Sequence, residues 1–246
     1  MSTLLIILVA QLLLLHLLSR YINGAMFSVF GKAVYLCVSF PGTVVHELSH
    51  LAGCLMTRTR VREIRLFSPR TEGDRFVLGS VSHDRPRGPL SSFIIGTAPF
   101  WGGAVVLWLA TTLLMPQTSA AVQLSLSVDG AASALGAFIT SIVEMARALV
   151  APDWRAWLVL YLLISIPTHL APSTEDLRNA AWGIVIVSVV IALLAAASAW
   201  FGWSSTGSIF DWTSAMLAVL TGLLAFASLC SALIALAVWT VSRFRR

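Results

Sequence analysis

Long apolar runs dominate this chain, and they restrict what it can fold into. A helix of about 20 apolar residues crosses the roughly 30 Å hydrocarbon core of a bilayer, where a spanning segment must satisfy its own backbone hydrogen bonds. The chain has 246 residues, 58% hydrophobic and 11% charged, whereas soluble domains average about 25% charged. We therefore predict an all-α polytopic membrane protein, a single domain over 1–246 with about six transmembrane helices. The predicted spans are residues 3–19, about 27–56, 91–115, 155–172, 180–201 and 213–241.

The largest polar stretch, residues 57–90, separates the second apolar run from the third. It carries eight arginines against four acidic residues, and the net charge of the whole chain is +5. In a membrane protein such a loop stays in the cytoplasm, so we expect contact with the lipid bilayer and no nucleic-acid partner. Inside it, VREIRLF and RFVLGSVS alternate apolar and polar residues on either side of SPRTEGD. This pattern predicts a small β-hairpin on the cytoplasmic side.

The segment 131–150 is also apolar and suggests a seventh span. Its Glu144 and Arg147 lie about one turn apart and can pair on a helix face. Six spans leave the C-terminal RFRR in the cytoplasm, as the positive-inside rule prefers, whereas seven would place it outside. We choose six and assign 116–154 to the outer side, with 131–150 as a helix on or near the outer surface. The size of the chain and the lack of a targeting segment favour a multi-pass protein of a bacterial cytoplasmic membrane.

The pentapeptide HELSH, residues 46–50, places ionisable groups inside the second apolar run. On a helix its two histidines share one face, so His46 and His50 can hold one Zn²⁺, while Glu47 can act as general base on a metal-bound water. The alternative is a polar cluster that seals helix contacts, with His50 bonded to a backbone carbonyl. Because intramembrane ionisable groups are costly and mostly functional, we favour the metal site. Pro41-Gly42, one turn earlier, predicts a kink that frees backbone groups near the histidines.

A catalytic zinc needs a third protein ligand and one open position. The stretch THLAPSTEDLRNA, 168–180, joins two predicted spans and offers His169, Glu175 and Asp176. With six spans it lies near the cytoplasmic face, and so does HELSH, because the second span ends about six residues, or about 9 Å, beyond His50. With seven spans the two segments would lie at opposite faces. A shared zinc therefore favours six spans independently of the charge rule.

Several motifs together resemble one known family. HELSH on an early span is followed by the arginine-rich hairpin, by a small-residue helix with Ala98-Pro99, and by a late Pro-x-x-x-Asp. Over roughly residues 27–185 this order is similar to the site-2 protease family of intramembrane zinc metalloproteases. H-E-x-x-H is the specific motif of that family, and the other motifs are weak alone.

The late motif of that family is Asn-x-x-Pro, a short spacer and Leu-Asp-Gly, and HLAPSTEDL is similar to it. Pro172 matches the proline, and Asp176 matches the third zinc ligand. His169 occupies the position of the asparagine, whose side chain in the family helps to hold the substrate or the oxyanion. Glu175 and Leu177 replace the leucine and the glycine, so the third ligand is either Asp176, which we favour, or Glu175.

The resemblance implies a zinc-dependent intramembrane endopeptidase that cuts membrane-spanning protein substrates near the cytoplasmic side. A regulatory membrane partner is a further expectation, because no soluble sensor domain is recognisable. Zn²⁺ is the implied cofactor. The implied metal ligands are His46, His50 and Asp176, and the implied catalytic residues are Glu47 and His169.

Two segments between these motifs each have two interpretations. The hairpin 61–82 can pair with an unwound substrate strand, or its arginines only fix orientation and touch anionic lipid. The small residues of GTAPFWGGA, 96–104, can allow close helix approach, or a backbone break at Pro99 can line the active cavity.

Three other functions stay open. The departures from Leu-Asp-Gly suggest a non-catalytic relative that binds transmembrane segments or metal, although it would not need Glu47. A membrane zinc peptidase that trims prenylated proteins would use a later glutamate as third ligand, and Glu144 and Glu175 are the candidates. A metal transporter is the least favoured, because the spans after residue 180 carry no ionisable residue in their interiors.

Overall fold

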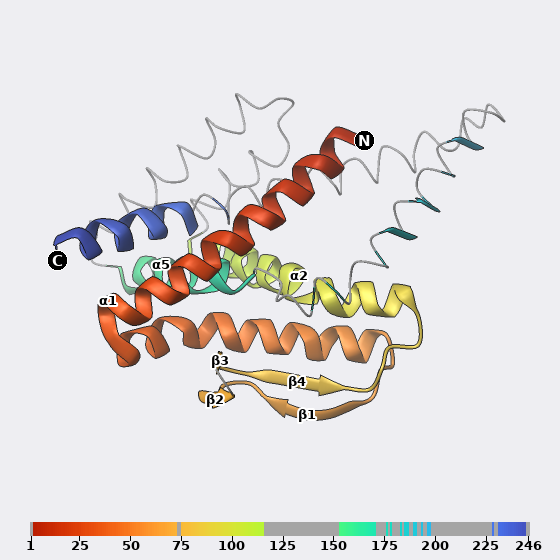
Figure 1. Ribbon diagram of the computed structural model, residues 1–246, viewed down its shortest axis with the longest axis horizontal. Helices are drawn as coiled ribbons and strands as arrows, with labels where there is room; N and C mark the ends of the chain where they lie inside the picture. Colours follow the sequence, from red (N-terminus) through yellow and green to blue (C-terminus); the bar gives the residue numbers. More distant parts are fainter. Residues whose placement is uncertain are drawn as a thin grey trace.

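The computed structural model in Figure 1 is mostly helical, with two small antiparallel sheets. It describes residues 2–72, 75–115, 153–170 and 231–244, with single helical positions between 176 and 197 and at 228. The predicted helical architecture with a small β insertion is confirmed in these residues. Several predictions lie outside the described residues. They concern the segment 131–150, most of the spans 180–201 and 213–241, and nearly all of the predicted outer segment 116–154.

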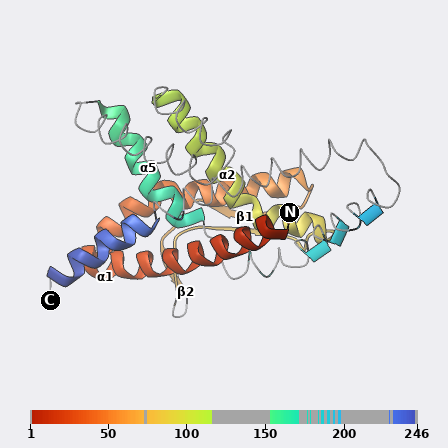
Figure 2. The same ribbon diagram turned by 90° about the horizontal axis from the view of Figure 1, so that it is seen from above.

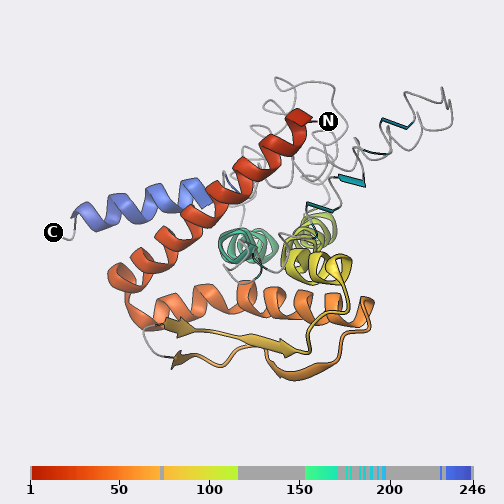
Figure 3. The same ribbon diagram turned by 45° about the vertical axis from the view of Figure 1, so that its right-hand side comes forward.

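Helix α1 (Ser2–Met56) contains both of the first two predicted spans. Figures 1 and 3 show that it folds back on itself into two arms, residues 2–30 and 32–56. The break lies at Gly31, whose φ of 82° and ψ of 170° define a conformation that is essentially restricted to glycine. The fold-back therefore depends on the one residue type that enters this conformation without strain.

The position of this break corrects the sequence prediction, which ended the first span at residue 19 and began the second near 27. The polar stretch between them is helical. In it Asn23 donates its side-chain N–H to the hydroxyl of Ser19, one turn earlier, at 3.3 Å. These two polar side chains thus pair with each other along the helix.

Among the described residues, two helices are long and apolar enough to cross a membrane, Leu13–Met56 within α1 and α2 (Pro89–Leu114). The described ranges also include two shorter helices, α5 (Trp154–Leu170) and the C-terminal helix Ser231–Phe244. Large apolar side chains stand exposed on the outer faces of the helices, as a lipid environment would require. They include Leu13, Leu17, Val105, Leu113, Trp157, Leu233 and Leu236.

Helices α2 and α5 lie between the two arms of α1 (Figure 3), and Figure 2 shows them side by side across the second arm. Their shared core joins Leu15 of the first arm to Phe100 of α2 and Val159 of α5, with Val45 of the second arm packed against it. A second cluster packs Ile22 of the first arm with residues of the C-terminal helix. The second arm, which carries HELSH, is thereby enclosed by helices on one side.

The predicted hairpin is confirmed, and it covers the other side of the second arm (Figure 1). Strand β1 (Val61–Arg65) pairs antiparallel with β4 (Ser80–His83), and Ile64 lies opposite Val81. The second predicted strand, RFVLGSVS, is divided in the structure. Its first part forms β3 (Arg75–Val77), which pairs with β2 (Arg70–Glu72) from the predicted connection.

Aromatic side chains attach the hairpin to the bend of α1. The ring of Phe76 in β3 lies 5.8 Å from that of Phe27 and 6.2 Å from that of Tyr35, between centroids. Phe27 and Tyr35 come from the two arms and flank Gly31. The hairpin is therefore fixed to both arms at the point where they meet.

Substituting Gly31→Ala should destabilise the protein by about 1–3 kcal/mol, the usual penalty for a strained backbone conformation. Thermal unfolding in detergent would measure the loss. Gly24→Ala is the matched control, because a Cβ there meets nothing within 4 Å and alanine favours helix. Equal unfolding temperatures for the two variants would contradict the glycine requirement.

Candidate metal centre

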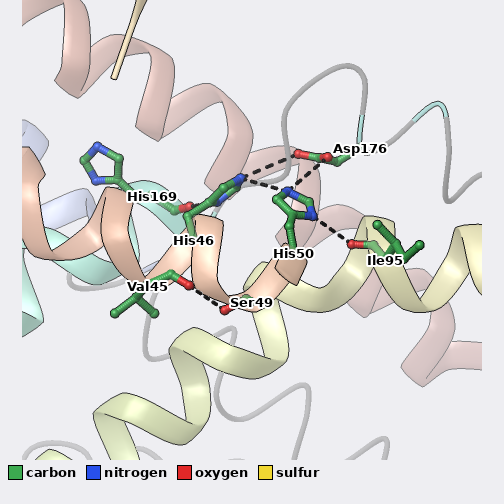
Figure 4. A network of polar contacts seen from close by, with 7 residues as sticks. All are labelled: Val45, His46, Ser49, His50, Ile95, His169 and Asp176. Atoms are coloured by element: carbon green, nitrogen blue, oxygen red, sulfur yellow. Dashed lines mark hydrogen bonds and ion pairs between the residues drawn. The ribbon is translucent and has the colours of Figure 1, made fainter. Parts of the chain in front are cut away.

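The two histidines of HELSH lie on one face of the second arm, as predicted, and their rings face each other (Figure 4). Their Nε2 atoms are 3.2 Å apart. The site is enclosed, since His50 is only 8% exposed and the neighbouring Glu47 only 7%. Spacing of four residues on a helix is what brings the two rings together.

Asp176 completes the group from the helical position that follows α5. Its Oδ1 lies 3.3 Å from Nε2 of His50, and its Oδ2 lies 3.8 Å from Nε2 of His46. One ligand atom from each of the three residues lies within 4.8 Å of the others. The structure thus brings together the three residues predicted as ligands, while Glu175 and Glu144 lie outside the described residues.

The outer nitrogens of both rings are held by main-chain carbonyls. Nδ1 of His46 lies 2.7 Å from the carbonyl oxygen of His169, and Nδ1 of His50 lies 3.0 Å from that of Ile95. A carbonyl oxygen only accepts hydrogen bonds, so each Nδ1 carries the hydrogen and donates it. In a neutral ring the Nε2 atom then presents a bare lone pair, which is the form that binds a metal.

Two such lone pairs and a carboxylate therefore point at one another in a buried space. A metal ion among them would bind all three atoms at once. Tetrahedral zinc bonds of 2.0–2.1 Å place neighbouring ligand atoms about 3.3 Å apart. The separations of 3.2 Å between the two Nε2 atoms and 3.3 Å between His50 and Asp176 fit this value, whereas the 3.8 Å between His46 and Asp176 would shorten when the metal binds. Two nitrogens and one oxygen form a usual catalytic zinc set, which leaves the fourth position open.

Glu47 lies beside the histidines and under the hairpin. Its carboxylate lies close enough to His50 and Asp176 to interact electrostatically with both. A Cβ on Gly79 would lie 2.8 Å from Cγ of Glu47, so the glycine leaves room for this side chain. The glutamate is thus placed between the metal-binding group and strand β4.

His169 contributes its carbonyl to the site, and its ring points away from Asp176 (Figure 4). Nδ1 of the ring donates to the carbonyl of Ser165 at 2.9 Å. Its Nε2 is buried without a hydrogen-bond partner among the residues that the structure describes. The catalytic role predicted for this side chain stays a prediction.

Sequence reasoning missed the two carbonyls that hold the histidine rings. One signal was present for His169, which lies in the last turn of α5, where carbonyls have no partner in their own helix. Such a carbonyl is available to a histidine from a neighbouring helix.

Small residues bring α1 and α2 close together at the site. A Cβ on Gly53 would lie 3.1 Å from Cβ of Ala98, and one on Gly102 would lie 2.7 Å from Cβ of Ser49. The interpretation of GTAPFWGGA as a close-packing segment is therefore supported.

No protein-family model, curated protein or solved structure matches this chain in the comparisons.

Replacing Asp176 by alanine should remove the metal, because the predicted site would lose its one charged ligand and keep only the two histidines. We expect about one zinc per purified wild-type chain and a loss of most of it in Asp176→Ala, measured by mass spectrometry of metals. Arg178→Ala, an exposed position in the same helical stretch, is the control and should retain zinc. Full zinc content in Asp176→Ala would exclude this residue as a ligand.

Proposed function

We propose that this protein is a zinc-dependent intramembrane endopeptidase that cleaves membrane-spanning protein substrates near the cytoplasmic side. The observation that carries the proposal is the buried group of His46, His50 and Asp176 with Glu47 next to it. His46, Glu47 and His50 lie on a helix that is apolar and long enough to cross a membrane, and Asp176 joins them from another part of the chain. The resemblance of its motifs to the site-2 protease family supports the same activity.

Each residue of the group has a defined task in this reaction. His46, His50 and Asp176 hold the zinc, which when bound polarises the scissile carbonyl and makes water nucleophilic at neutral pH. Glu47 accepts the proton of the attacking water on its carboxylate and then donates it to the nitrogen of the leaving amine. The enclosure of Glu47 by the hairpin keeps bulk water from competing for that proton.

Strand β4 offers a place for the substrate backbone. Strand β4 runs beside the site, because a Cβ on Gly79, just before the strand, would lie 2.8 Å from Cγ of Glu47. The N–H of Asp84 bonds to the carbonyl of Arg60, just before β1. With the alternation along a strand, the N–H groups of His83 and Val81 then point to the edge of β4 away from β1. No described strand occupies this free edge. An extended substrate segment can add to that edge by main-chain hydrogen bonds, which supports the substrate-pairing interpretation of the hairpin.

The charge of the hairpin supports cleavage near the cytoplasmic side. Three of its arginines pair with acids, Arg62 with Asp84, Arg65 with Glu63 and Arg70 with Glu72. The remaining arginines around it include Arg58, Arg60, Arg85 and Arg87, all exposed. Because such positive clusters stay in the cytoplasm, the nearby metal-binding group would act close to that face.

A second function, a non-catalytic relative that binds transmembrane segments or metal, is favoured by one observation. The ring of His169 points away from the metal-binding group, so no described side chain takes the role of the family's asparagine. The alternative keeps the metal site and the substrate edge but assigns no hydrolysis to them.

The substitution Glu47→Gln separates the two functions. It should retain zinc and reduce cleavage of a panel of single-span model substrates by at least about 100-fold, because it removes the general base. Cleavage in lipid nanodiscs would be followed by gel and mass spectrometry. Glu72→Gln in β2 is the control and should cleave like wild type. Zinc-loaded wild type that cleaves none of the panel, like Glu47→Gln, would favour the non-catalytic alternative.

The substrate edge can be tested at His83, two residues along β4 from Val81. His83→Pro removes a main-chain N–H on the free edge, and the loss of one hydrogen bond should slow cleavage about 2- to 10-fold. His83→Ala is the matched control, because it removes the side chain but keeps the N–H. Equal rates for both variants, with equal zinc content, would show that the substrate does not pair at this position.

A further inference from the structure

The carbonyl that holds His50 belongs to a helix that would normally use it internally. In an α-helix the carbonyl of Ile95 accepts a hydrogen bond from the N–H of residue 99. Residue 99 is a proline inside α2, and proline has no N–H to give. Ile95 is 4% exposed and Pro99 is fully buried, so water does not satisfy this oxygen. A buried carbonyl without a partner is unfavourable, and Nδ1 of His50 provides the partner at 3.0 Å.

We propose that Pro99 is a positioning residue of the metal centre, because it frees the Ile95 carbonyl to orient the ring of His50. The bond fixes the hydrogen on Nδ1, so Nε2 faces His46 and Asp176 as a bare lone pair. The inference rests on the metal site of the proposed function and does not depend on peptide cleavage.

The packing of α1 on α2 makes this contact possible. A Cβ on Gly53 would lie 3.2 Å from Cα of Ile95, so the two backbones approach closely three residues beyond His50. This approach brings the freed carbonyl within reach of the imidazole. Two features of GTAPFWGGA therefore act together on His50. The small residues bring α2 close to α1, and Pro99 leaves the carbonyl of Ile95 available to the imidazole.

A second proline of the same fold provides an internal comparison. Pro41 in α1 likewise lacks the N–H that the carbonyl of Cys37 would accept, and the hydroxyl of Tyr161 in α5 donates to that carbonyl at 2.5 Å. In both places a side chain from a neighbouring helix binds a carbonyl that a proline has freed. Only at Pro99 is that side chain a predicted metal ligand.

The variant Pro99→Ala tests the proposal, because it returns an N–H that competes with Nδ1 of His50 for the Ile95 carbonyl. Loss of such a partner of a metal ligand weakens metal binding about 10- to 100-fold. We expect the zinc dissociation constant, measured by competition with a chelator dye, to rise at least about 10-fold. The unfolding temperature of the metal-free protein should change little, because alanine restores a helix hydrogen bond as it removes packing.

Tyr161→Phe is the matched control. It removes the donor to the other proline-freed carbonyl, so it should lower the unfolding temperature and leave the zinc dissociation constant within about twofold of wild type. A role of Pro99 in packing alone would give Pro99→Ala the same pattern as Tyr161→Phe. That outcome would overturn the proposal.

The hydrogen position on His50 can be measured without metal and without cleavage. Nitrogen NMR of the histidine-labelled, metal-free protein reports which ring nitrogen carries the hydrogen, and a His50→Gln sample identifies the signal. We expect a hydrogen on Nδ1 of His50 in wild type, whether or not Nε2 also carries one towards Asp176, and a smaller share of the Nδ1–H form in Pro99→Ala. A wild-type Nδ1 without a hydrogen would overturn the proposal even if Pro99→Ala did not fold. A wild type that binds no zinc would refute the metal site itself, whereas zinc binding that is unchanged by Pro99→Ala would refute only the role of Pro99.

Discussion

The candidate site depends on three metal-binding side chains that gather in a buried space. The Nε2 atoms of His46 and His50 and the carboxylate of Asp176 meet at 3.2 to 3.8 Å, and the surrounding helices are apolar. In such surroundings a buried carboxylate needs a compensating positive charge. A metal ion held by the three atoms would supply that charge. The carbonyls of His169 and Ile95 hold the outer nitrogen of each ring, which leaves the opposite nitrogen available to a metal.

The sequence predicted the parts of this centre whose geometry is local. His46 and His50 face the same way because four residues make about one helical turn, and no tertiary information is needed. The hairpin followed from alternation over VREIRLF and RFVLGSVS. The kink predicted at Pro41-Gly42 is not where α1 breaks, because Pro41 lies inside the helix and the non-helical angles are at Gly31. The prediction of Asp176 relied on the resemblance of HLAPSTEDL to a family motif, and it names the residue that the structure places against the histidines.

The sequence did not predict what depends on the rotation of one helix against another. The break of α1 at Gly31 was missed because glycine also occurs inside helices, as Gly24 does here, and its backbone angles depend on the packing of the two arms. The direction of the His169 ring was missed for a similar reason. A motif match fixes the position of a residue along the chain but not the face of the helix on which its side chain lies.

Helix α5 is held against α1 by a row of polar contacts. Tyr161, Ser165 and Thr168 lie on one face of α5, and each makes a polar contact with α1. The hydroxyl of Tyr161 donates to the carbonyl of Cys37, the N–H of Gly42 donates to the hydroxyl of Ser165 at 2.8 Å, and the hydroxyl of Ser19 donates to the carbonyl of Thr168 at 2.5 Å. Between helices in a lipid bilayer, hydrogen bonds and the close packing of small residues stabilise association, because burial of apolar surface contributes little there.

These contacts also determine where His169 can go. A Cβ on Gly42 would lie 2.7 Å from Nδ1 of the His169 ring, so the ring packs on the glycine and stays turned towards Ser165. With the ring held there, the carbonyl of His169 in the last turn of α5 lies 2.7 Å from Nδ1 of His46 and accepts its hydrogen. The contacts that hold α5 against α1 therefore also set the orientation of a predicted metal ligand.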